Sequence, residues 1–229
     1  MTLMRMDWVT RLAAFGLVVG LTAGFAATGT AQSVSGRAYG AYANTPLGSV
    51  SQSPLAVLPY TSGTDGNIAT AQADALGAGG ALSSDFLNSM TSGAIGASEA
   101  GAQSVASVGD INILGGLITA KEVIATVTSS RTASGATSNA NGSSFEDLVV
   151  AGVPVTTGDA AVAPNTRMSL PSVGYVVLNE QIPTGDGVTS SGLTVNMIHV
   201  YLQSAGGLLG GVTNTGEIVV GSASSAVGQ

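Results

Sequence analysis

The chain of 229 residues contains no cysteine. Disulfide bridges, thiolate zinc sites and cysteine nucleophiles are therefore excluded. A domain of this kind must be stabilised by burial of its core alone, for which about 200 residues suffice.

Charge is also scarce, since only 8% of the residues are Asp, Glu, Lys or Arg, against about 25% in an ordinary soluble domain. The six basic residues are outnumbered by thirteen acidic ones, and only four basic residues lie beyond position 31. Nucleic-acid binding is not expected, because it requires clustered basic side chains to neutralise phosphates. A weakly charged surface rich in small residues is typical of extracellular structural or adhesive proteins.

Residues that would carry hydrolytic chemistry are few. His199 is the only histidine and Trp8 the only tryptophan. No G-x-S-x-G motif surrounds any serine, and the carboxylates are spread along the chain rather than paired. We expect no catalytic residues and no enzyme activity, and a secreted hydrolase is the least favoured function. His199 is expected to be hydrogen-bonded within a sheet or to face solvent.

The N-terminus has the three parts of a secretory signal peptide. The first part is basic and contains Arg5 and Arg11, and the second is the apolar run at 12–27. The third, Gly29-Thr30-Ala31, supplies the small residues that precede a cleavage site. The run is shorter than the roughly 20 residues that span a bilayer. We predict cleavage after Ala31 and secretion of residues 32–229 without a transmembrane span; the alternative is an uncleaved membrane anchor.

Beyond residue 31, short apolar runs alternate with Gly- and Ser-rich stretches. Thirty-three glycines and many β-branched residues predict numerous short strands joined by turns. We expect an all-β fold, a single β-sandwich or jelly-roll-like domain over residues 32–229, with a β-solenoid as the alternative. Residues 60–109 are the least defined part and are interpreted as strands and loops.

The strands can be placed by their alternation of residues. They are expected at 35–44, 50–58 (ended by Pro59), 111–114, 117–129, 167–170, 173–181, 193–203 and 216–225, with a pair of strands within 145–155 and a polar loop at 130–144. In the strand at 193–203, one face carries Thr194, Asn196, Ile198, Val200 and Leu202, and the other carries Val195, Met197, His199 and Tyr201. We expect Ile198 and Val200 to point into the core. Glu180 and Asn196 are expected to bond the backbone of neighbouring strands.

Several short motifs occur in an order similar to that of choice-of-anchor P proteins, a family of secreted bacterial surface proteins. They are Gly115–Ala120, Pro164-Asn165-Thr166 followed by Leu170-Pro171, Asn179-Glu180-Gln181, Val195–Val200 and Glu217–Ala223. The resemblance covers about residues 105–226, with a weaker echo at 36–59. It implies a location at the cell surface and no known chemistry. The sequence ends at Gln229 without a sorting motif or apolar tail, so a covalent or transmembrane C-terminal anchor is not expected.

Calcium is the only cofactor that the loops suggest. Asp65, Asn67 and Asp186 offer oxygen ligands beside glycines, but neither loop has the twelve-residue calcium pattern. The alternative is ordinary turn chemistry, because Asp, Asn and Gly favour turns. No other metal or cofactor is expected.

Taken together, these features predict a secreted, non-enzymatic extracellular or cell-surface protein with a structural or adhesive role. Its expected partners are cell-wall or matrix components, or further copies of itself. A self-assembling fibre or matrix subunit is the alternative, because strands of Gly, Ala, Ser and Thr lack the Lys and Pro that protect sheet edges.

Overall fold

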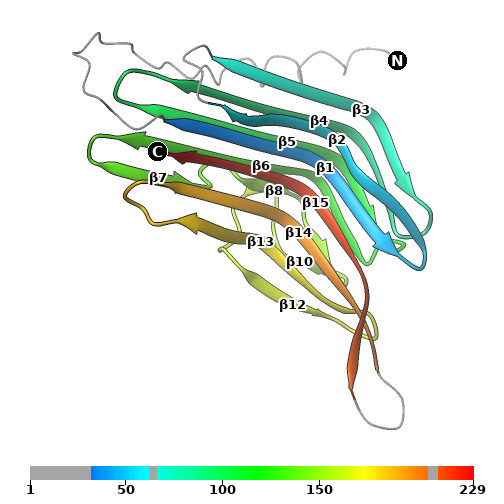
Figure 1. The fold of residues 1–229 in the computed structure, drawn as a ribbon. Helices are drawn as coiled ribbons and strands as arrows, with labels where there is room; N and C mark the ends of the chain where they lie inside the picture. The colour runs from blue at the N-terminus through cyan, green and yellow to red at the C-terminus, as the bar shows by residue number, and fades with distance from the viewer. Residues whose placement is uncertain (1–31, 62–65, 206–210) are drawn as a thin grey trace.

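The computed structural model describes residues 32–61, 66–205 and 211–229. They form two antiparallel sheets packed face to face, with no helix, so the predicted all-β sandwich is confirmed (Figure 1). The antiparallel pairing of every strand rules out the alternative of a solenoid built from stacked parallel coils. The predicted signal peptide lies outside the described residues. No helix capable of crossing a bilayer occurs in the part of the chain that the structure describes.

The first sheet has six strands in the order β12-β13-β14-β15-β1-β2. They are β12 (Thr166–Leu170), β13 (Gly174–Gly185), β14 (Ser191–Ala205), β15 (Val212–Gly228), β1 (Ser33–Thr45) and β2 (Gly48–Thr61). The N-terminal and C-terminal strands pair in its middle, where Ser33 lies opposite Gly228.

The second sheet has nine strands, and its main path runs β10-β9-β6-β5-β4-β3. Its long strands are β3 (Asn67–Ala78), β4 (Leu82–Ile95), β5 (Ala100–Ile113) and β6 (Ile118–Thr132). The short strands β7 (Gly135–Asn139), β8 (Ser144–Glu146), β9 (Val149–Val150), β10 (Val153–Pro154) and β11 (Asp159–Ala160) continue it beyond β6.

The strands are longer than the sequence predicted. The nine long strands run from 12 to 17 residues, and β2 continues past Pro59 to Thr61. Three of them, β3, β4 and β5, cover most of residues 60–109, the least defined part of the sequence. The predicted polar loop at 130–144 contains β7. Gly and Ser were taken as breaks, but here they lie inside strands, because the two sheets approach too closely for larger residues.

A bend crosses both sheets part-way along the strands (Figure 1). In the six-stranded sheet it passes through Asn179 and Gly221, which have φ of 49° and 66° and lie at the level of Met197. In the nine-stranded sheet it passes through Phe86 and Asp110, with φ of 52° and 48°. Residues with positive φ act as bulges that bend a strand and re-aim its side chains.

The alternation of inward-facing residues changes phase at this bend. In β14, Val195 and Met197 are buried before it, and Ile198 and Val200 are buried after it, all four at 0% exposure. The prediction that Ile198 and Val200 face the core is confirmed. The placement of Val195 and Met197 on the opposite face was wrong, because a single period of two was assumed along a strand that has two phases.

The bend divides the interior into two halves, which we call the aliphatic half and the hydroxyl half. The aliphatic half is filled by large side chains, among them Ile113, Ile118, Phe145, Ile198 and Ile218, each at 0% exposure. The hydroxyl half is lined mostly by small residues, including Gly36, Ala106, Thr91, Ser104, Ser129 and Ser225, although Val127 and Val195 are also buried there. A separate apolar cluster that includes Val34, Leu58 and Val227 closes the far end of the hydroxyl half.

Candidate functional site

The outer face of the six-stranded sheet carries a connected set of polar side chains at the bend, which we call the outer-face cluster. It comprises Glu180 of β13, Asn196, His199 and Tyr201 of β14, and Glu217 and Ser222 of β15. It lies on the side of the sheet opposite the core. The alternation of the strands brings these residues together, because positions 180, 196 and 222 share one row across the sheet.

Glu180 is the centre of the outer-face cluster. Its Oε2 atom accepts a hydrogen bond from the Asn196 amide at 2.8 Å and lies 2.7 Å from His199 Nδ1. The Tyr201 hydroxyl donates to Oε1 at 2.8 Å. Ser222 extends the network by donating to Asn196 Oδ1 at 2.8 Å. The prediction that Glu180 and Asn196 bond the backbone of neighbouring strands was wrong in its partners, because both residues bond side chains of the neighbouring strands instead.

The electrostatics follow from this arrangement. Burial is the largest influence on Glu180 and favours its neutral form, but the hydrogen bonds from His199, Asn196 and Tyr201 together outweigh it and lower its pKa to about 2. Burial, and then the bond to the Glu180 carboxylate, raise the pKa of Tyr201 well above its ordinary value. Near neutral pH the cluster therefore holds an ionised Glu180 and a neutral Tyr201.

Both nitrogens of His199 face carboxylates, since Nε2 lies 3.3 Å from Glu217 Oε2. A general base must reach the hydroxyl or water that it activates. The serine of the cluster, Ser222, bonds Asn196 and not the imidazole. The hydrogen bonds of the cluster connect three strands, and within the cluster no serine hydroxyl is hydrogen-bonded to the His199 imidazole.

Aromatic rings extend the outer-face cluster along the sheet. Tyr175 and Tyr201 lie directly opposite each other and stack with ring centroids 4.7 Å apart. His199 stacks on Tyr201 at 4.0 Å, and the Arg167 guanidinium lies 3.7 Å from the centre of Tyr175. This stack could not be located from the sequence, since it depends on the pairing register of β12, β13 and β14.

The calcium candidates are not brought into one site by the described residues. Asp65 lies outside them, Asn67 begins β3 of the nine-stranded sheet, and Asp186 follows β13 of the other sheet. Asp186 accepts backbone hydrogen bonds from Val188, Thr189 and Ser190, and the Thr189 hydroxyl also donates to it. These bonds, the Thr189 hydroxyl first, hold the pKa of Asp186 well below its usual range.

Asp186 thus organises its own turn, as the turn interpretation of this loop predicted. No group of three His, Asp or Glu residues suited to a metal ion occurs within the described ranges. Calcium binding at any of the three positions stays a prediction.

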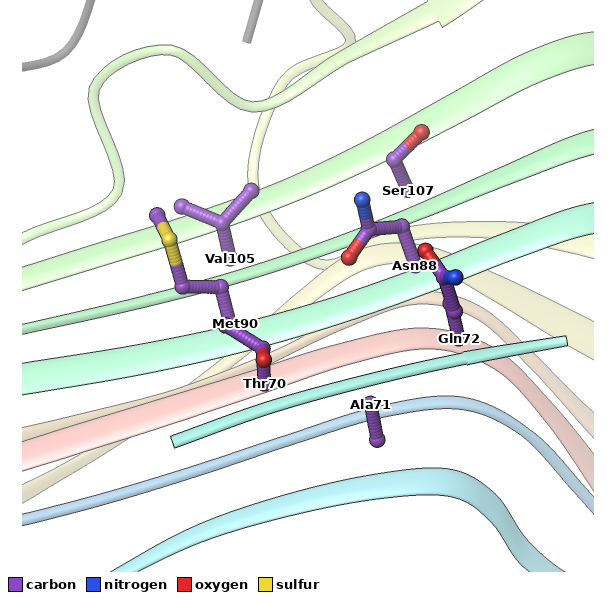
Figure 2. A pocket seen from close by; sticks show the side chains of 7 residues that line it. All are labelled: Thr70, Ala71, Gln72, Asn88, Met90, Val105 and Ser107. Carbon is purple, nitrogen blue, oxygen red and sulfur yellow. The ribbon is translucent and has the colours of Figure 1, made fainter. Parts of the chain in front are cut away.

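A second candidate site is a shallow hollow of about 490 Å³ on the outer face of the nine-stranded sheet. Figure 2 shows the residues that line it, Thr70, Ala71 and Gln72 of β3, Asn88 and Met90 of β4, and Val105 and Ser107 of β5, with the Ala71 side chain pointing away from the others. Amide and hydroxyl groups lie here beside apolar ones, and no lining residue is charged. Such a surface can offer hydrogen bonds to a neutral ligand. The sequence did not single out these residues.

Comparison of the chain with protein-family models, curated proteins and solved structures found no match. The resemblance to choice-of-anchor P proteins therefore rests on the sequence motifs alone and stays a prediction.

Proposed function

We propose that the chain is a secreted, non-enzymatic structural or adhesive protein of the cell surface or extracellular matrix. The observation that carries the proposal is the outer-face cluster. The only histidine and its carboxylate partners are bonded to one another across three strands. His199, Glu180 and Glu217 are residue types common in catalytic sites, and here their contacts with one another link β13, β14 and β15.

The hollow on the nine-stranded sheet supports the adhesive part of the proposal. Asn88 and Gln72 supply amides, Ser107 a hydroxyl, and Met90 an apolar contact (Figure 2). This chemistry suits the uncharged sugar and amide groups of a cell-wall or matrix polymer, because contact with them buries no charge. The resemblance to choice-of-anchor P proteins also favours the cell surface.

Expression of the full chain in a bacterial host tests the location. We expect the extracellular protein to begin at or near Gln32 by intact mass. The recovery of the full-length chain embedded in the membrane would contradict secretion.

Binding is tested with the exported protein and purified cell-wall sacculi. The protein is expected to sediment with the sacculi, and Asn88→Ala to sediment less than Ser130→Ala, an exposed serine of β6 outside the hollow. Hydrolysis of wall material that is lost in a folded His199→Gln variant would show that the protein is an enzyme instead.

A further inference from the structure

The outer edges of the two sheets differ in how well they are protected. In the six-stranded sheet, β12 has five residues and β2 contains Pro54, which has no N–H to donate. In the nine-stranded sheet, the edge beyond β6 is formed by β7, β10 and β11, each of five residues or fewer, whereas the opposite edge, β3, has twelve. β3 contains no proline and no lysine, and Asp74 is its only charged residue.

The side chains of β3 are also incompletely covered. Ala69, Ala71 and Ala73 face inward but are only half-buried, whereas the inward-facing Ala106 of the central strand β5 is at 0% exposure. On the outer face, Ile68 is 73% exposed. A long, nearly uncharged edge of this kind is a template for pairing with another strand. No other described strand pairs with this edge.

We propose that β3 pairs antiparallel with β3 of a second copy, so that the two nine-stranded sheets become continuous across a two-fold axis. A second copy fits because the other described edges are too short or, in β2, carry proline, whereas β3 of a second copy has the same length and no proline. A two-fold contact uses the same surface on both copies and closes on itself.

The straight part of β3 before the bend specifies the register. If Ala71 lies opposite Ala71 of the second copy, then Ala69 lies opposite Ala73, and the inward row of alanines continues across the axis. On the outer face, Thr70 then lies opposite Gln72. Asp74 meets Ile68 rather than its own counterpart, so the pairing brings no like charges together.

Sedimentation of the purified full chain tests the pairing. The wild type is expected to sediment at twice the mass of one chain. The double substitution Thr70→Lys with Gln72→Lys places like charges directly opposite each other, and it is expected to weaken association by about tenfold or more. Both positions are exposed, so the fold of each copy is preserved.

The matched control is Ser49→Lys with Ser51→Lys, which adds the same charge at two exposed positions of the β2 edge. It is expected to remain a dimer. Because the chain has no cysteine, Ala71→Cys is expected to give a disulfide-linked dimer on mild oxidation, whereas Ser169→Cys on the β12 edge is not.

A monomeric wild type, or a lysine variant that stays as dimeric as the wild type, would overturn the proposal. Open-ended assemblies that survive the β3 substitutions would also overturn it, since they would require another edge. The pairing through β3 rests on the proposed structural role, but either proposal can be contradicted without the other. The proposed function is tested by the location of the protein and by its sedimentation with sacculi. The pairing is tested by the mass of the purified protein in the absence of sacculi.

Discussion

On the Ile113 side of the bend, the two sheets are joined by large aliphatic side chains, whereas on the Gly36 side they are joined by hydroxyl groups. In the hydroxyl half, Ser104 donates to the Ser224 carbonyl at 2.6 Å, and Ser129 donates to the Ser225 carbonyl at 2.9 Å, each across the space between the sheets. Ser89 likewise donates to the Pro54 carbonyl at 2.8 Å. In the aliphatic half, contacts such as those of Ile198 and Phe145 are purely apolar.

The difference shows how a chain with so little charge and few aromatic residues fills a large interior. A Cβ at Gly36 would overlap the Thr91 hydroxyl and lie 2.8 Å from Ser104 Oγ, so the sheets approach as closely as glycine and serine permit. Close approach then lets short hydroxyl side chains reach the opposite backbone. The aliphatic half buries large apolar side chains, and the hydroxyl half adds inter-sheet hydrogen bonds to a closer packing of the sheets.

The largest effect is expected from shortening a side chain in the aliphatic half. Ile198→Ala should lower the free energy of unfolding by about 2–5 kcal/mol, because it removes buried methyl groups and leaves a cavity. His199→Ala, one position away on the outer face, should cost less, about 1–2 kcal/mol for lost hydrogen bonds. Urea denaturation of both variants measures the difference. If Ile198→Ala left the free energy of unfolding unchanged while His199→Ala unfolded the protein, His199 rather than Ile198 would point into the core.

The next largest effect is expected from adding a methyl group to the hydroxyl half. Gly36→Ala should cost about 1–3 kcal/mol, because the sheets must separate to accommodate the new atom. Gly77→Ala is the matched control, since no atom lies within 4 Å of a Cβ there and the position also belongs to a strand. Equal stability of the two variants in urea would mean that the sheets are not closely packed at Gly36.

Much of the fold was predictable where the sequence is apolar and β-branched. The strands at 117–129 and 193–203 and the turns around Gly115 and Pro171 lie where the alternation placed them. The hydroxyl half was not recognised as strand interior, because Ser, Gly and Ala are typical of turns unless two sheets approach closely. That approach is a tertiary property and is not encoded in any one segment.

The phase change at the bend had a local signal that was not used. The sequence Leu193–Leu202 has apolar residues at alternate positions until Met197 and Ile198 stand side by side, after which alternation resumes on the other parity. An adjacent apolar pair inside an alternating run indicates a bulge. The outer-face cluster, in contrast, needs the register of three strands, so the sequence could place Glu180 and His199 on strands but could not join them.

An intermediate effect is expected from the outer-face cluster, and it should depend on pH. The folded pKa of Glu180 is lowered from its ordinary value of 4.5 to about 2. Its charge therefore stabilises the fold fully above pH 4.5, and this contribution is lost as the pH falls through 2. We expect Glu180→Gln to be less stable than the wild type at pH 7, and the gap to narrow between pH 4.5 and 2. A gap that widens in acid would contradict this account of the carboxylate.

The smallest effect is expected from a single hydroxyl group between the sheets. Ser104→Ala removes the bond to the Ser224 carbonyl and the 2.9 Å contact with Thr91 Oγ1, which should cost about 1 kcal/mol. Ser130→Ala, at an exposed position of β6, should cost less. Hydroxyl groups do not titrate, so the cost of Ser104→Ala should be the same at pH 7 and pH 3, in contrast to Glu180→Gln. A pH-dependent cost for Ser104→Ala would contradict this, because it would mean that ionisable groups influence the hydrogen bonds of the hydroxyl half.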